Sequence, residues 1–191
     1  MPTLDSIFLE GRSHKRFGDE PVPEHLLRSL WERAALAPTA NNCCPLRVVF
    51  VHSASEMEVL ANMAHGYNVE RVKTAPAAAI LAYDLDYYRQ FQHLAPHMQQ
   101  PPAQAEWPTE RLERVALMNA NIQAGFLIAA ARALGLDCGP MGGFEADQIE
   151  SHFFTDPHWR FNFVVLLGQG DPEALRPRAP RLSFETGCRL V

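Results

Sequence analysis

Apolar residues recur every three or four positions over several stretches of the chain, which is the spacing of one buried face of an α-helix. The longest stretch lies in the second half, where Val115 and Met118 begin a series that ends close to Gly135, a residue typical of helix ends. Pro23 stands where a helix can begin, and Pro38 ends the same helix. The pattern predicts helices at residues 1–10, 24–37, 55–65, 109–136 and 149–154.

Short apolar runs rich in β-branched residues are typical of buried strands. Three such runs occupy residues 47–51, 78–83 and 162–168. The glycine-rich run 138–144 is predicted to be a loop. Because the visible strands are few and the segments between them are irregular, the pattern predicts an α+β fold and one domain that spans residues 1–191.

Composition excludes several classes of protein. With 191 residues, of which 47% are hydrophobic and 20% charged, the chain resembles a typical globular domain. The net charge of -5 argues against non-specific binding to nucleic acid. No apolar run reaches the roughly 18 residues that a membrane span needs, and the charged residues throughout the first thirty positions predict no signal peptide, so a cytoplasmic protein is expected. The four cysteines lack the spacing of a zinc site, and no metal site is predicted.

Polar residues gather in five places where they could bind a ligand. Most basic residues are arginines, which suit a phosphate, although taken alone this excess is better explained by a codon bias of the source genome. Taken one at a time, the five places are equally explained by solvated charged segments or ordinary turns. They are Arg12, Ser13, His14 and Arg16; Asn41 and Asn42; Asn68 and Arg71; the loop 139–143; and Arg178 and Arg181.

The order of these clusters is more specific than any one of them. Five motifs occur in this order along the chain: Arg-Ser-x-x-Arg-Phe, Ala-Pro-Thr-Ala-x-Asn-x-x-Pro, Asn-x-x-Arg before a strand, Gly-Pro-Met-Gly-Gly-Phe, and Arg-x-Pro-Arg in the C-terminal segment. This series resembles the FMN-dependent nitroreductase family over essentially the whole chain. Within the family, the resemblance is greatest to the malonic semialdehyde reductase subgroup, whose members are also named NADH dehydrogenase/NAD(P)H nitroreductases. The segments 40–43, 139–144 and 182–185 carry that finer resemblance.

The resemblance implies a nitroreductase-like fold, with a mainly antiparallel sheet flanked by helices, and an intertwined homodimer with FMN at the subunit interface. It implies that the FMN phosphate and pyrimidine edge are held by Arg12, Ser13, His14 and Arg16, and that the phosphate site is completed by Arg178 and Arg181. Asn68 and Arg71 would bind the pyrimidine and ribityl side of the flavin. Flavin N5 would be faced by the backbone of Pro140, Met141, Gly142 and Gly143. The partner subunit would supply a loop that lies along the flavin, formed by Pro38, Thr39, Ala40 and Asn42. Many family members carry an acidic residue where this chain has Gly142.

The activity that the resemblance implies needs no catalytic side chain, because the hydride chemistry belongs to the cofactor. NADH or NADPH would reduce FMN at N5, and the flavin would then reduce malonic semialdehyde to 3-hydroxypropionate in a ping-pong reaction. Two alternatives stay open. One is an NAD(P)H nitroreductase or quinone reductase with an unrelated physiological role, and the other is a flavin-binding protein without turnover.

Overall fold

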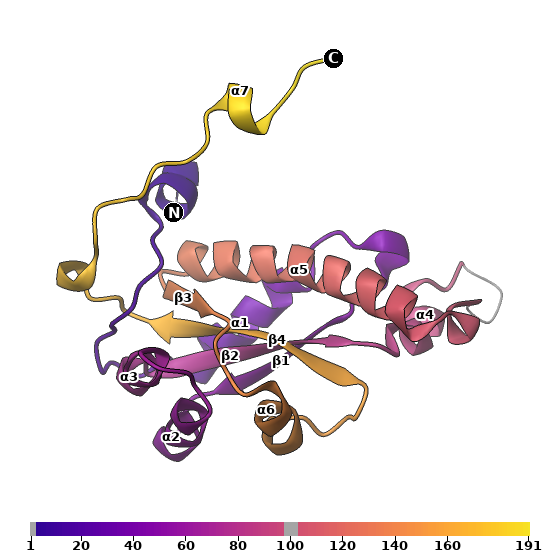
Figure 1. The fold of residues 1–191 in the computed structure, drawn as a ribbon, viewed down its shortest axis with the longest axis horizontal. Helices are drawn as coiled ribbons and strands as arrows, with labels where there is room; N and C mark the ends of the chain where they lie inside the picture. The colour runs from indigo at the N-terminus through magenta and orange to yellow at the C-terminus, as the bar shows by residue number, and fades with distance from the viewer. Residues whose placement is uncertain (1–2, 98–102) are drawn as a thin grey trace.

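Four antiparallel strands form the centre of the molecule (Figure 1). The computed structural model describes residues 3–97 and 103–191. Every residue of β2, one of the two inner strands, is buried, which agrees with the continuous apolar run that predicts it. The strands are β1 (Leu46–Val51), β2 (Ala77–Asp84), β3 (Asp137–Met141) and β4 (Trp159–Gly168), and their order in the sheet is β1-β2-β4-β3.

The prediction of a loop in the glycine-rich run is wrong over its first half, because this half forms the edge strand β3. Cys138 of this strand pairs with Leu167 of β4. Pro140 has no N–H group to donate, and a proline is tolerated in an edge strand, where one side needs no backbone partner. Glycine and proline are typical of loops, so the sequence pattern did not predict this strand, which forms by pairing with β4.

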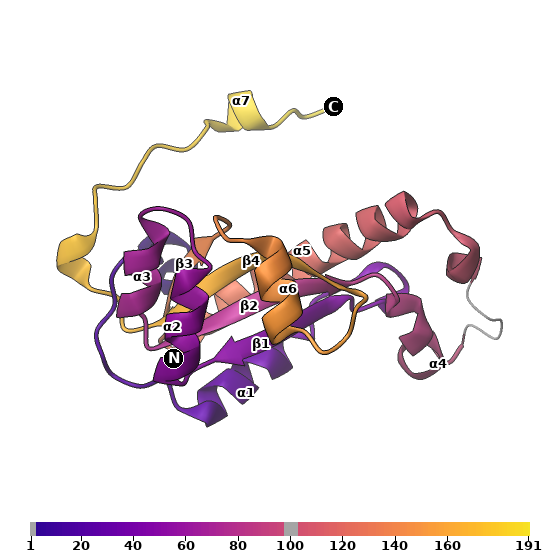
Figure 2. The same cartoon turned by 60° about the horizontal axis from the view of Figure 1, so that its bottom comes forward.

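Helices cover both faces of the sheet (Figures 1 and 2). On one face lie α1 (Glu24–Ala34) and α5 (Thr109–Ala133); on the other lie α2 (Ala54–Asn62), α3 (Asn68–Thr74) and α6 (Ala146–Phe153). Each face has its own apolar cluster, with Leu30 and Leu127 fully buried in the first, and Leu60 and Ile149 in the second. This arrangement confirms the predicted α+β class. The short helices are η1 (Ser6–Glu10), η2 (Ala40–Asn42), η3 (Tyr87–Gln90), α4 (Phe91–Leu94), η4 (Ala103–Glu106), η5 (Pro172–Ala174) and α7 (Phe184–Gly187).

The long helix α5 has two apolar faces. Leu127 and its neighbours at helical spacing pack against the sheet. Met118, Ile122 and Phe126, which follow one another at intervals of four residues, are 55%, 40% and 45% exposed. The apolar pattern of this helix therefore indicates a second apolar surface, which the described residues leave uncovered.

The C-terminal segment leaves the body of the protein after η5 and runs away from it (Figures 1 and 2). All residues from Arg176 onward are exposed, including Leu182 and Phe184. Ser183 caps α7, since its side chain accepts a hydrogen bond from the backbone N–H of Thr186. None of the described helices combines the length and apolarity that crossing a lipid bilayer requires.

Candidate ligand-binding site

A cavity of about 450 Å³ lies where the N-terminal segment, the last turn of α5 and the C-terminal segment meet. Its lining contains six cations and no acidic residue, and within the described part of the chain none of the six is paired with a carboxylate. Uncompensated charge of one sign attracts an anionic group, and guanidinium groups favour phosphate. We call it the cationic cavity; its cations are Arg12, Lys15, Arg132, Arg176, Arg178 and Arg181.

The N-terminal segment reaches this place because it runs along the free edge of β3. Ser13 forms a bridge with Cys138, and the backbone N–H of His14 donates to the carbonyl oxygen of Cys138 at 2.8 Å. A Cβ atom on Gly139 would stand 2.6 Å from the carbonyl oxygen of His14. Only glycine therefore permits so close an approach of the two segments.

Two arginines tie the C-terminal segment to the N-terminal one. Arg12 donates from Nη2 to the carbonyl oxygen of Arg176, and Arg178 donates from Nη2 to the carbonyl oxygen of Gly11 at 2.9 Å. These contacts use only some of the five N–H donors of each guanidinium. The remaining donors are available to a ligand in the cavity.

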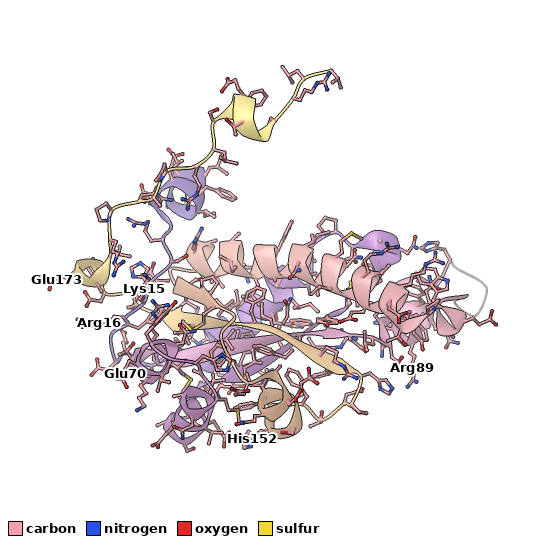
Figure 3. All side chains as sticks on the ribbon, viewed as in Figure 1. Lys15, Arg16, Glu70, Arg89, His152 and Glu173 are labelled. Atoms are coloured by element: carbon pink, nitrogen blue, oxygen red, sulfur yellow. The ribbon has the colours of Figure 1, made fainter. Side chains whose placement is uncertain are left out.

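The four residues predicted in the N-terminal segment do not all face the cavity. Arg12, Ser13 and Lys15 line the cavity, whereas His14 and Arg16 do not. His14 is 6% exposed, and its Nε2 lies 3.3 Å from Oδ1 of Asp137. Arg16 is exposed, and its Nη1 lies 3.4 Å from Oδ2 of Asp171, the residue before η5. Figure 3 labels Arg16 and Lys15.

Three of the six cations were not among the predicted residues. Lys15 and Arg176 lie inside or next to predicted clusters, so the local concentration of charge was a usable signal. Arg132 carried no such signal, because an arginine in the last turn of a helix is common on electrostatic grounds alone.

A second polar group lies beyond the other end of β3. Asn68 is 8% exposed; its Nδ2 donates to the carbonyl oxygen of Gly143 at 3.4 Å, and its Oδ1 accepts from Nη1 of Arg71 at 3.2 Å. A Cβ atom on Gly143 would stand 2.7 Å from Nδ2 of Asn68, whereas one on Gly142 would meet no atom within 4 Å. The guanidinium of Arg71 lies 4.2 Å from the centre of the Tyr67 ring. The fold thus brings two predicted clusters together, and it leaves open space at Gly142.

Strand β3 connects the cationic cavity to this second group. Ser13 lies beside Cys138, and Gly143 follows Cys138 by five residues, a distance of about 17 Å along an extended chain. Pro140 and Met141 lie between the two ends and are only partly buried. An elongated ligand that is anionic at one end and has hydrogen-bonding groups at the other matches this arrangement.

The predicted loop from Pro38 to Asn42 lies elsewhere in the same chain. The backbone N–H of Ala40 donates to Oδ1 of Asn119 at 2.8 Å, which holds η2 beside the middle of α5. Asn119 precedes Arg132 by thirteen residues, or about 20 Å of helix. Within one chain, this loop is therefore separated from the cationic cavity by half of the longest helix (Figure 1).

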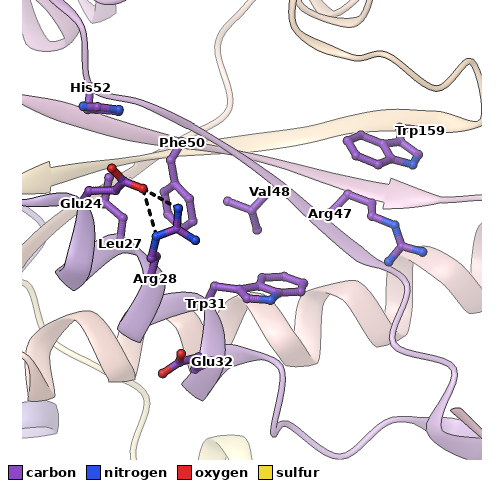
Figure 4. A pocket seen from close by; sticks show the side chains of 10 residues that line it. All are labelled: Glu24, Leu27, Arg28, Trp31, Glu32, Arg47, Val48, Phe50, His52 and Trp159. Atoms are coloured by element: carbon purple, nitrogen blue, oxygen red, sulfur yellow. Dashed lines mark hydrogen bonds and ion pairs between the residues drawn. The ribbon is translucent and has the colours of Figure 1, made fainter.

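A different cavity, of about 570 Å³, lies between α1 and the edge strand β1 (Figure 4). Trp31, Phe50 and Trp159 line it, and Glu24 accepts a hydrogen bond from Nε of Arg28 at 2.9 Å on its rim. None of the predicted site residues belongs to it. Apart from the loop Pro38–Asn42, the predicted site residues therefore lie around β3 or in the segments beside it.

The buried cysteines have little nucleophilic character. Burial raises the pKa of the Cys43 thiol to about 11 and that of the Cys138 thiol to about 12. Both therefore stay protonated at neutral pH. Among residues 3–97 and 103–191, no three His, Cys, Asp or Glu side chains are grouped so that they could hold a metal ion.

Comparison with known proteins identifies the class. The model of the nitroreductase family matches residues 10–169. A curated relative from Ralstonia nicotianae, named "Putative NADH dehydrogenase/NAD(P)H nitroreductase", is 43% identical over 196 residues and covers 100% of both chains. A relative of the same name from Leptothrix cholodnii is 44% identical over 98% of this chain and 95% of its own.

Solved structures agree in fold. A nitroreductase family protein from Streptococcus pneumoniae superposes with a TM-score of 0.87 at 24% identity, over 99% of this chain and 100% of its own. A protein from Exiguobacterium sibiricum, described as a "putative nitroreductase in complex with FMN", has a TM-score of 0.87 at 23% identity, over 100% of this chain and 98% of its own. The chain belongs to the nitroreductase family.

Proposed function

We propose that this member of the nitroreductase family, an FMN-dependent oxidoreductase, takes a hydride from NADH or NADPH and reduces malonic semialdehyde to 3-hydroxypropionate. The observation that carries the proposal is the cationic cavity, joined by β3 to the polar group around Asn68 and Gly143. FMN has the same order of groups, with a phosphate, a ribityl chain and a flat polar ring. The FMN complex of the Exiguobacterium protein and the names of the curated relatives support the cofactor and the hydride donor.

The donor set fits the cofactor. Six cations without a carboxylate suit a dianionic phosphate, and an amide fixed on both sides suits the polar edge of a flavin. His14 and Arg16 face away from the cavity, so we leave them out of the phosphate-binding set. In this assignment the phosphate is held by Arg12, Ser13, Lys15, Arg178 and Arg181, the ring edge by Asn68 and Arg71, and the ring lies along the backbone of Pro140, Met141, Gly142 and Gly143.

When bound, FMN supplies the chemistry, accepting a hydride from the nicotinamide and passing it to the acceptor. The side chains of the protein bind and orient. Gly143 fixes the amide of Asn68, since its missing Cβ leaves room for Nδ2, and Arg71 holds the amide oxygen. The absence of a side chain at Gly142 leaves the approach to this part of the site open.

An anionic acceptor is compatible with this site. A side-chain carboxylate at the position of Gly142 would repel the carboxylate of malonic semialdehyde. Here the position is uncharged, and the guanidinium of Arg71 is bonded to Asn68, whose amide donates to the next residue, Gly143. The second candidate is a nitroaromatic or quinone acceptor, of which the nitro compound is favoured by the word nitroreductase in the names of the curated relatives.

We further propose that the enzyme is a homodimer in which the loop Pro38, Thr39, Ala40 and Asn42 completes the flavin site of the partner. The uncovered apolar stripe of Met118, Ile122 and Phe126, next to which this loop is anchored, supports that surface as the interface. The exposed apolar residues of the C-terminal segment would find cover on the partner. Four free cysteines suit a reducing compartment, and we place the enzyme in the cytoplasm.

The visible spectrum of the protein, purified without added cofactor, tests the proposal. We expect a flavin spectrum that bleaches under anaerobic NADH or NADPH and returns when malonic semialdehyde is added. Arg12→Ala should bind FMN about ten- to a hundredfold more weakly, because a charge-assisted hydrogen bond contributes roughly 1.5–3 kcal/mol. Arg33→Ala, at an exposed arginine of α1, is the control and should stay yellow.

Three results would contradict parts of the proposal. A protein that takes up no FMN overturns the cofactor assignment. A reduced flavin that nitro compounds reoxidise but malonic semialdehyde does not overturns the substrate. A fully yellow Arg12→Ala variant overturns the position of the phosphate.

A further inference from the structure

We propose that Arg132, from the last turn of α5, is a phosphate-binding residue of the cationic cavity, and that Gly11 is the residue that makes room for it. This inference rests on the proposed FMN binding and adds to it a cation from a third segment of the chain. The other five cations come from the N-terminal and C-terminal segments.

The guanidinium of Arg132 crosses from α5 to the N-terminal segment. Its Nη1 donates to the carbonyl oxygen of Ile7 at 3.0 Å, and its Nε is buried without an acceptor among the described residues. An arginine has five N–H donors, so the single bond to Ile7 leaves most of them unused. A buried donor without a partner is costly, and an anion in the adjacent cavity would compensate its charge.

Gly11 permits this crossing. A Cβ atom at this position would stand 2.7 Å from Nε and 2.8 Å from Cδ of Arg132. The backbone of Gly11 has φ -54 and ψ 132, which any residue adopts, so its conformation does not require glycine. The requirement is therefore one of space beside the arginine and the neighbouring carbonyl of Ile7.

The end of α5 explains why a cation is needed there. The carboxyl end of a helix carries a partial negative charge, which disfavours a phosphate beside it. Arg132 stands in that last turn and also lines the cavity. Its charge offsets the helix end and leaves the whole lining of the cavity favourable to an anion.

The test compares the dissociation constants of FMN and of riboflavin, which lacks the phosphate, measured by flavin fluorescence. Arg132→Gln removes the charge but keeps an amide that can donate a hydrogen bond. We expect it to weaken FMN about tenfold and to leave riboflavin unchanged. The loss of FMN affinity in Arg132→Gln should become smaller when the NaCl concentration is raised from about 0.1 M to about 1 M, because the added salt shortens the Debye length from about 10 Å to about 3 Å.

Arg33→Gln is a matched control, because Arg33 also stands in the last turn of a helix and donates to a backbone carbonyl, that of Ser29 at 2.9 Å. Gly11→Ala should reproduce the selective loss of FMN affinity. Gly18→Ala is its control, since a Cβ there would meet no atom closer than 3.9 Å.

The outcomes separate this inference from the proposed function. If wild-type protein binds neither flavin, the proposed function fails, and this inference fails with it. If wild-type protein binds FMN and Arg132→Gln binds it equally well, only the role of Arg132 is refuted. Equal weakening of FMN and riboflavin in Arg132→Gln refutes it too, because that result means a general loosening of the site.

Discussion

The two adjacent glycines after β3 offer a test of how the second polar group is built. A Cβ atom on Gly143 would stand 2.7 Å from Nδ2 of Asn68, closer than non-bonded atoms tolerate, and one on Gly142 would meet nothing within 4 Å. Neither glycine has a positive φ, so alanine is compatible with the backbone at both positions. The pair of alanine variants therefore isolates the contact with Asn68.

The two variants are expected to change the free energy of unfolding in opposite directions. Replacing glycine by alanine at a compatible position stabilises a protein by about 0.4–1 kcal/mol, through the entropy of the unfolded chain. Gly142→Ala should show only this gain. Crowding a packed site costs about 1–3 kcal/mol, so Gly143→Ala should lose about 1–2 kcal/mol after the same gain. In a chain of this size that loss lowers the melting temperature by about 2–8 °C.

The assay is thermal unfolding of both variants without flavin, followed by FMN titration. Displacement of the Asn68 amide should also weaken FMN about tenfold in Gly143→Ala, since the hydrogen bond from Arg71 to Oδ1 moves with it. If Gly143→Ala is as stable as Gly142→Ala and binds FMN equally well, the Asn68 amide does not depend on this glycine, and the reasoning is refuted.

Two further predictions concern the cysteines and the interface. At pH 8 a thiol reagent should modify the exposed Cys188 quickly and leave Cys43 and Cys138 intact until the protein unfolds. Burial raises the pKa values of these two thiols to about 11 and about 12, so that little thiolate is present at pH 8. Rapid reaction of either buried thiol in the folded protein would contradict this prediction. Phe126→Glu, which places a charge in the apolar stripe of α5, should convert the proposed dimer into monomers in sedimentation velocity, with Arg33→Glu as an exposed control on α1. A Phe126→Glu protein that stays dimeric would place the interface elsewhere.

Periodic patterns of apolar residues are enough to predict most of the helices and strands. Helical spacing of apolar residues predicts α1, α2, α5 and α6 to within a few residues at their ends, and continuous apolar runs predict β1, β2 and β4. These signals are local, because each element must bury a stripe or a face of its own. The clusters near Arg12, Asn68 and Arg178 were also visible, since charge and amide groups were concentrated there.

Other features depend on contacts between distant segments, which no local pattern contains. β3 exists because β4 pairs with it, although Pro140 and the glycines are typical of a loop. The contact of the N-terminal segment with β3 selects Lys15 for the cationic cavity and turns His14 toward Asp137. Arg132 is separated by more than a hundred residues from the Arg12 cluster, and only the end of α5 brings it there. Such choices depend on contacts between distant parts of the chain, and a periodic pattern carries no information about them.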